Sequence, residues 1–105
     1  MIPRVYDSRK KGETDFRHDR YTVVCMFPKK AQKLNNARGI YITCCPSDYD
    51  DTIYVCEENL IPFGEYVNKG YYCFGKKVDI DTLPEFFKNW IKEKNEIATN
   101  WDELN

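Results

Sequence analysis

The cysteines are the residues of this 105-residue chain that could act as nucleophiles or bind a metal. A cysteine nucleophile needs a base and an electropositive setting, and the chain has one histidine, His18, in the charged segment 15–20. No CxxC pair occurs, so we expect no zinc or other metal site. We expect buried, unreactive thiols, and a Cys-dependent enzyme is the second alternative to the functions given below. The cysteines are Cys25, Cys44, Cys45, Cys56 and Cys73.

Acidic residues and tyrosines gather in the middle of the sequence, around a segment with turn composition. A calcium loop would need a glycine at its sixth position, and the residues after Asp48 supply none, so we expect a solvated hairpin turn. Tyrosine beside carboxylates suits a basic partner surface, such as the nucleic-acid channel of another protein. The sequence therefore predicts an acidic partner-binding patch that consists of Asp48, Tyr49, Asp50, Asp51, Tyr54, Glu57 and Glu58.

The first third of the chain is basic, although the formal net charge is −1. Residues 1–38 carry ten basic and four acidic residues, a net charge of +6, and residues 39–105 carry six and thirteen, a net charge of −7. Together with aromatic residues on expected strands, this basic segment indicates single-stranded nucleic-acid binding as the alternative function. The residues that would contact phosphates are Arg9, Lys10, Lys11, Arg17, Arg20, Lys29, Lys30 and Lys33.

The sequence contains no motif for a cofactor or for targeting. Its five glycines are isolated from one another, so there is no phosphate-binding loop and we expect no cofactor. The basic start is not followed by the apolar segment of a signal peptide, and no stretch reaches the length of a membrane span. We therefore expect a cytoplasmic protein without a membrane partner, in which thiols stay reduced.

Alternation of apolar residues predicts the sheet that would position these side chains. Residues 20–27 predict a central strand, because both of its faces are apolar, and Pro28 ends it. Residues 39–45 and 52–57 predict a hairpin around the turn 46–51. Residues 59–67 indicate a broken edge strand, and residues 70–75 indicate the last strand.

Two further segments have a less regular pattern. Residues 29–38 predict either a short helix, over about 29–37, or a long hairpin loop. Residues 1–19 predict a charged arm or irregular lead-in, in which Ile2, Val5 and Tyr6 could dock as a short edge strand.

A closing helix is predicted over residues 82–97. Thr82 and Glu85 have the spacing of a capping box, and apolar residues then recur at steps of three and four. We expect this face to pack across the sheet, with Trp101 anchoring the tail; if Phe87 or Trp90 were exposed, the helix would be a homodimer interface. The residues expected in the core are Phe86, Phe87, Trp90 and Ile91.

The chain is thus expected to form one α+β domain over residues 1–105. Its architecture is an antiparallel sheet of about four to five strands, with one C-terminal amphipathic helix packed on a face. The leading hypothesis for function is a small non-catalytic binding protein that occupies the surface of another protein. Small size, segregated charge and the lack of a catalytic set are typical of the inhibitors and anti-defence factors that phages and mobile elements encode.

Overall fold

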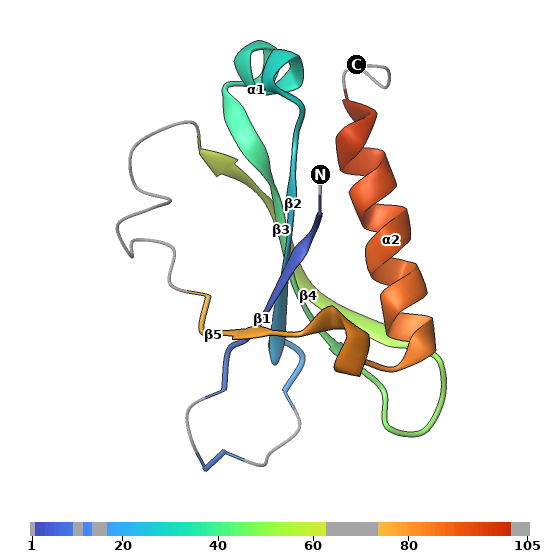
Figure 1. Ribbon diagram of the computed structural model, residues 1–105. Helices are drawn as coiled ribbons and strands as arrows, with labels where there is room; N and C mark the ends of the chain where they lie inside the picture. The colour runs from blue at the N-terminus through green and yellow to red at the C-terminus, as the bar shows by residue number, and fades with distance from the viewer. Residues whose placement is uncertain (1, 10–11, 14–16, 63–73, 102–105) are drawn as a thin grey trace.

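Five antiparallel strands form one sheet in the computed structural model, which describes residues 2–9, 12–13, 17–62 and 74–101 (Figure 1). The strand order is β4-β3-β2-β1-β5, so the first four strands are a meander and the last returns to the first. This confirms the expected α+β class. The strands are β1 Arg4–Asp7, β2 Tyr21–Met26, β3 Ala37–Pro46, β4 Ile53–Pro62 and β5 Lys76–Val78.

The central strand β2 is buried on both faces, as its composition predicts. Val23 and Cys25 are fully buried on one face, and Thr22 and Val24 are buried on the other. β2 lies between β1 and β3, where Val23 is the register partner of both Val5 and Ile42. Because these residues belong to three adjacent strands, they form the floor of the core.

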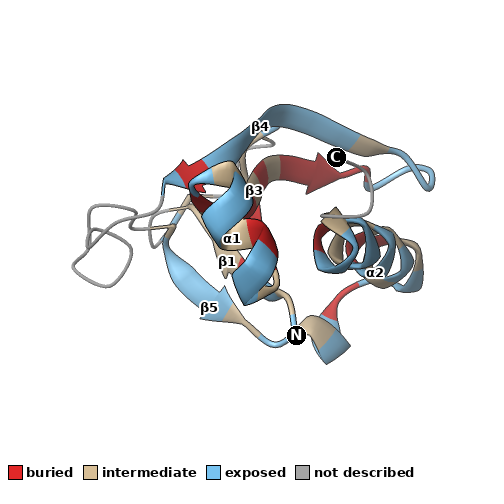
Figure 2. Ribbon diagram, turned by 90° about the horizontal axis from the view of Figure 1, so that it is seen from above, coloured by how far each residue is buried: buried red, intermediate tan, exposed pale blue. Residues whose placement is uncertain are grey.

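The helix α2 (Glu85–Thr99) lies across one face of the sheet (Figures 1 and 2). Phe87 and Ile91 are buried, and the ring of Phe87 contacts the ring of Tyr21 with centroids 5.4 Å apart. Burial of side chains of this size stabilises the fold by about 1.5–3 kcal/mol each. Trp90 is partly buried against the same core. Phe87 and Ile91 are therefore core, as predicted, whereas Phe86, which was also expected there, is only partly buried. Because neither Phe87 nor Trp90 is exposed, the condition for a homodimer interface on this face is not met.

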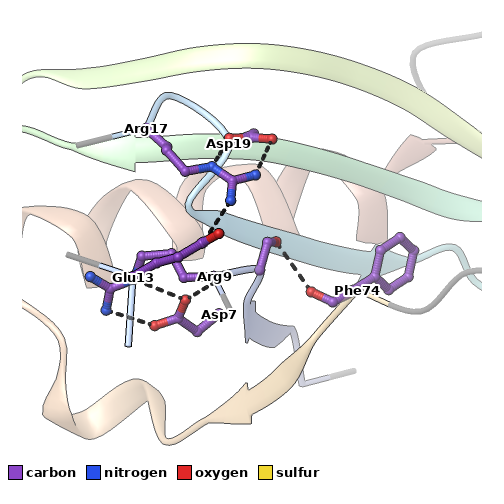
Figure 3. Close-up of polar contacts among 7 residues, drawn as sticks. Asp7, Arg9, Glu13, Arg17, Asp19 and Phe74 are labelled. Atoms are coloured by element: carbon purple, nitrogen blue, oxygen red, sulfur yellow. Dashed lines mark hydrogen bonds and ion pairs between the residues drawn. The ribbon is translucent and has the colours of Figure 1, made fainter. Parts of the chain in front are cut away.

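Aromatic side chains cover the opposite face of the sheet. The ring of Phe74 contacts the rings of Tyr6 and Tyr41, with centroids 5.6 Å and 5.5 Å apart. Ser8 donates a hydrogen bond to the carbonyl oxygen of Phe74 (Figure 3). The Ser8 hydroxyl also lies 3.1 Å from that of Thr22. Phe74 is thereby held against the second face.

The start of the closing helix differs from the prediction. The predicted capping box at Thr82 is wrong. Ile80–Thr82 instead form a short 3-10 helix. The helix α2 begins at Glu85, three residues later than predicted, with Pro84 as its N-cap. The hydroxyl of Thr82 donates to the carbonyl oxygen of Asp79 and does not cap α2. At its other end the helix continues to Thr99 rather than 97.

The short helix is confirmed, as α1 (Lys29–Asn35), and it excludes the alternative of a hairpin loop there. It buries Ala31 and ends at Asn36, which has a left-handed backbone with φ of 50°. The predicted lead-in contains β1, and β1 is internal rather than an edge strand because it pairs with both β2 and β5.

Two predicted strand boundaries also change. Residues 59–62 continue β4, so the first part of the expected broken strand belongs to the hairpin, and residues 63–67 lie outside the described residues. Of the predicted last strand, residues 70–73 lie outside the described residues, and 74–75 are not in a strand. The strand β5 instead begins at Lys76, where it pairs with β1.

No helix in the described part of the chain is long and apolar enough to cross a lipid bilayer.

Candidate functional site

The seven residues of the predicted acidic patch all lie on the β3–β4 hairpin, which we call the acidic hairpin. Its turn, residues 47–52, projects from one end of the sheet, and β4 then forms an outer strand of the sheet (Figure 1). No basic residue occurs between positions 39 and 62. The hairpin thus carries five carboxylates and a single basic residue, Arg38, which lies near the start of β3.

Ser47 organises the turn through its hydroxyl group. Its Oγ accepts hydrogen bonds from the backbone N–H groups of Tyr49 and Asp50, at 3.1 Å and 3.3 Å. The backbone N–H of Ser47 also donates to the carbonyl oxygen of Thr52, at 2.8 Å, which closes the turn. Side-chain hydrogen bonds of this kind hold a turn in one conformation.

The turn presents one tyrosine to solvent between carboxylates. Tyr49 is 98% exposed, and its neighbours Asp48, Asp50 and Asp51 are exposed too. Hydrogen bonds from Thr52 and Ser47 lower the pKa of Asp50 below its usual value, so this carboxylate remains charged in mildly acidic solution. The turn thus offers an aromatic ring and fixed negative charge without a neighbouring cation in its own segment.

The strand β4 is exposed along most of its length (Figure 2). Val55 and Leu60 are each 48% exposed, and they are the register partners of the buried residues Cys44 and Ile40. They therefore lie on the same face of the sheet as α2, but on the outer strand β4, which leaves them partly exposed. A register shift between Thr43 and Cys44 leaves Cys56 without a partner on β3, as in a β-bulge.

The two glutamates of the acidic hairpin point to opposite faces of β4. Glu57 is the register partner of Thr43, and its carboxylate accepts hydrogen bonds from the hydroxyl of Tyr41 and the amide of Asn59. Glu58 is the partner of Ile42 and shares the face of α2. Both are exposed, so the middle of β4 carries negative charge on either side.

Several of the predicted phosphate-binding residues are engaged with other side chains. Arg9 donates two side-chain hydrogen bonds to the carboxylate of Asp7, and Arg17 binds Glu13 and Asp19 with N–O distances of 2.9 Å (Figure 3). The guanidinium carbon of Arg20 lies 4.6 Å from the ring centroid of Tyr21. These arginines have fewer donors left for phosphates than the sequence suggested.

The remaining predicted phosphate contacts lie elsewhere in the fold. Lys29, Lys30 and Lys33 are exposed on α1, which is at the opposite end of the sheet from the segment that carries Arg9 and Arg17 (Figure 1). Lys10 and Lys11 lie outside the described residues. The basic residues that are described thus form two separate groups, and nucleic-acid binding remains a prediction.

Buried thiols account for three of the five cysteines. Burial raises the pKa of Cys25 and of Cys44 to about 12 in each case, and it raises the pKa of Cys45 as well. Such thiols stay protonated at neutral pH and are poor nucleophiles.

The other cysteine sites differ in exposure. Cys56 is exposed, because β4 is an outer strand of the sheet, and the prediction that it is buried is therefore wrong. Cys73 lies outside the described residues. The ring of His18 stacks on Tyr54 with centroids 5.3 Å apart, which places the histidine against the acidic hairpin.

Two features of this surface are not predicted by the sequence: the hydrogen bonds of Ser47 in the turn, and the exposure of Val55 and Leu60 on β4. One is the role of Ser47 as the acceptor that fixes the turn; its position directly before an Asp-rich segment was the available signal. The other is the exposure of Val55 and Leu60, which have the alternation of a half-buried strand and so gave no sign that they lie at the edge.

Comparison with protein-family models, with curated proteins and with solved structures gave no match for this chain.

Proposed function

We propose that this protein is a non-catalytic binding protein whose acidic hairpin docks on a basic surface of another protein. The observation that supports this most directly is Tyr49, which is 98% exposed on a turn that Ser47 holds in place, between exposed carboxylates. Tyrosine is enriched among the residues that dominate binding energy in protein interfaces. A turn that is ordered before binding also loses less entropy when the partner arrives.

The charge of the acidic hairpin indicates the class of partner. Its five carboxylates would raise the rate of encounter with a basic surface and disfavour acidic partners. A basic surface on a protein is often one that binds nucleic acid, so a small domain seated there would act as a competitive inhibitor. This is the inhibitor or anti-defence role that the composition suggests.

The proposal is tested by affinity capture from host extract with two variants that each remove three charges. The first is Asp48→Asn/Asp50→Asn/Asp51→Asn in the turn, and the matched control is Lys29→Gln/Lys30→Gln/Lys33→Gln on α1. We expect a stoichiometric partner that the wild type and the α1 variant retain and the turn variant loses. Affinity for the purified partner should fall with added salt and with Tyr49→Ala.

Equal capture by the turn variant and the wild type would contradict the proposal. Oligonucleotide binding that the α1 variant abolishes and the turn variant leaves intact would instead favour the nucleic-acid alternative. Both variants change exposed residues, so their free energies of unfolding should stay close to that of the wild type.

A further inference from the structure

The outer edge of β4 is the feature from which we infer how the partner is recognised. β4 is ten residues long and is the terminal strand in the order β4-β3-β2-β1-β5, so no other strand in the described ranges pairs with its second edge. Residues 54–60 are all exposed. A long exposed edge offers a row of backbone donors and acceptors to another extended chain.

We propose that β4 binds an extended segment of the partner by strand addition, and that this segment carries two adjacent basic residues. The inference rests on the proposed function and adds to it the form in which the basic partner is recognised. Backbone hydrogen bonds of an added strand supply affinity, and the side chains of β4 supply specificity.

Glu57 and Glu58 define the charge that the added strand must carry. They are adjacent and point to opposite faces, so each would lie beside a different residue of the added strand. Oppositely charged pairs across neighbouring strands are favourable, and like-charged pairs are unfavourable. Two adjacent lysines or arginines in the added strand therefore satisfy both faces at once.

Leu60 adds an apolar requirement on one face. It is 48% exposed and lies two positions from Glu58 along β4, on the same face of the sheet as Glu58 and α2. A residue of the added strand opposite Leu60 would be two positions from the basic residue opposite Glu58. In an added strand that runs antiparallel to β4, the expected segment therefore has an apolar residue, any residue, and then the two basic residues.

A second copy of this chain fits the edge poorly. If two β4 strands paired antiparallel about the middle of the strand, Glu57 of one copy would lie opposite Glu58 of the other, twice over. Shifting the register by one residue places identical glutamates opposite each other instead. The same carboxylates that favour a basic segment thus disfavour a homodimer through this edge.

The test uses a synthetic peptide with the pattern Thr-Val-Thr-Lys-Lys-Thr-Val-Thr, titrated into the ¹⁵N-labelled full chain and followed by NMR. We expect amide shifts along β4 and none on the outer face of α2. Two further peptides carry N-methyl groups on alternate residues, in complementary sets. Because only one set of backbone N–H groups of an added strand faces β4, one methylated peptide should lose affinity about tenfold or more and the other should not.

Charge reversal supplies the matched variants. Glu57→Lys/Glu58→Lys should abolish binding of the Lys-Lys peptide and create binding of its Glu-Glu counterpart. Glu93→Lys/Glu96→Lys makes the same change in charge on exposed positions of α2 and should leave binding of the Lys-Lys peptide within about twofold.

Three results would overturn the inference, namely no shifts along β4 at millimolar peptide, equal behaviour of the two methylated peptides, or a dimer in sedimentation that Glu57→Lys/Glu58→Lys alters. Each of these would leave the proposed function standing, because that depends on the turn variant in capture from extract. Conversely, normal capture of the partner by the turn variant would contradict the proposed function. Peptide binding at β4 would still be measured separately and would decide the strand-addition inference on its own.

Discussion

The indole ring of Trp101 stacks on the ring of Phe27, with centroids 5.0 Å apart and an angle of 23° between the planes. Phe27 follows the central strand β2 and is fully buried. Trp101 follows α2, so this contact joins the end of the helix to the end of the strand beneath it. Trp101 is therefore packed against the core, as its size predicts.

Trp101→Ala should lower the free energy of unfolding by about 2 kcal/mol, because it removes a partly buried ring and its stacking contact. The measurement is urea denaturation followed by circular dichroism. Ile97→Ala is the control on the same helix, since Ile97 is 40% exposed, and it should cost less than about 1 kcal/mol. Equal losses for the two variants would show that the stack does not anchor the helix.

Ser47→Ala should weaken partner binding several-fold without changing the charge of the acidic hairpin. It removes the oxygen that accepts the N–H groups of Tyr49 and Asp50, so the turn must be ordered at the time of binding. Calorimetry with the purified partner measures the change. Ser47→Thr keeps a hydroxyl group and should restore much of the affinity; failure of both variants alike would indicate a packing effect at this buried position.

Thiol reactivity should separate one cysteine from three others in a Cys73→Ser background. Cys56 is exposed, whereas burial raises the pKa of both Cys25 and Cys44 to about 12 and that of Cys45 in the same direction. Ellman's reagent at pH 8 should therefore modify one thiol rapidly, and the other three only after urea is added. Cys56→Ser should abolish the rapid phase, and a rapid phase that persists would show that a core thiol is accessible.

The ion pair of Asp7 and Arg9 should stabilise the protein at neutral pH and lose this effect in acid. Burial alone would raise the pKa of Asp7, but the hydrogen bonds and charge of Arg9 hold it below its usual value. The stabilisation is therefore fully present above the pKa of the unfolded chain, about 3.9, and is lost as pH falls through the lower folded value.

Asp7→Asn measures this contribution. The variant should be less stable than the wild type at pH 7 by less than about 1 kcal/mol, since both side chains of the pair are 23% exposed. The difference should shrink as the pH falls below about 4. Arg9→Gln should show the same trend in urea denaturation, and a difference that grows in acid would contradict this account.

Local pattern predicted the elements whose side chains alternate or recur regularly. β2 is apolar on both faces and is central, and α2 has the three- and four-residue spacing that places Phe87 and Ile91 in the core. The helix start could not be predicted, because Thr82 has capping chemistry but bonds to Asp79 instead. β5 has little strand character in Lys76–Val78, and its pairing with β1 depends on a contact between distant segments.

The acidic hairpin could be predicted as a site because its residues are neighbours in the sequence. The turn and its carboxylates needed no tertiary information. The exposed edge did need it, since the pattern of Ile53–Pro62 is equally compatible with a strand that has partners on both sides. The ion pairs of the arginines could not be predicted in this way, because nothing in the sequence identifies Asp7 as the partner of Arg9 or Asp19 as the partner of Arg17.

The order of the strands also has a consequence for synthesis on the ribosome. β1 to β4 pair with their neighbours in the chain, so this part of the sheet can form while the polypeptide is still emerging. Among the described residues, α2 is the helix that packs on the face of the sheet with Val23 and Ile42, and it is made last. During that interval the nascent chain presents an apolar sheet face to solvent, and a chaperone that binds such faces would compete with the helix for it.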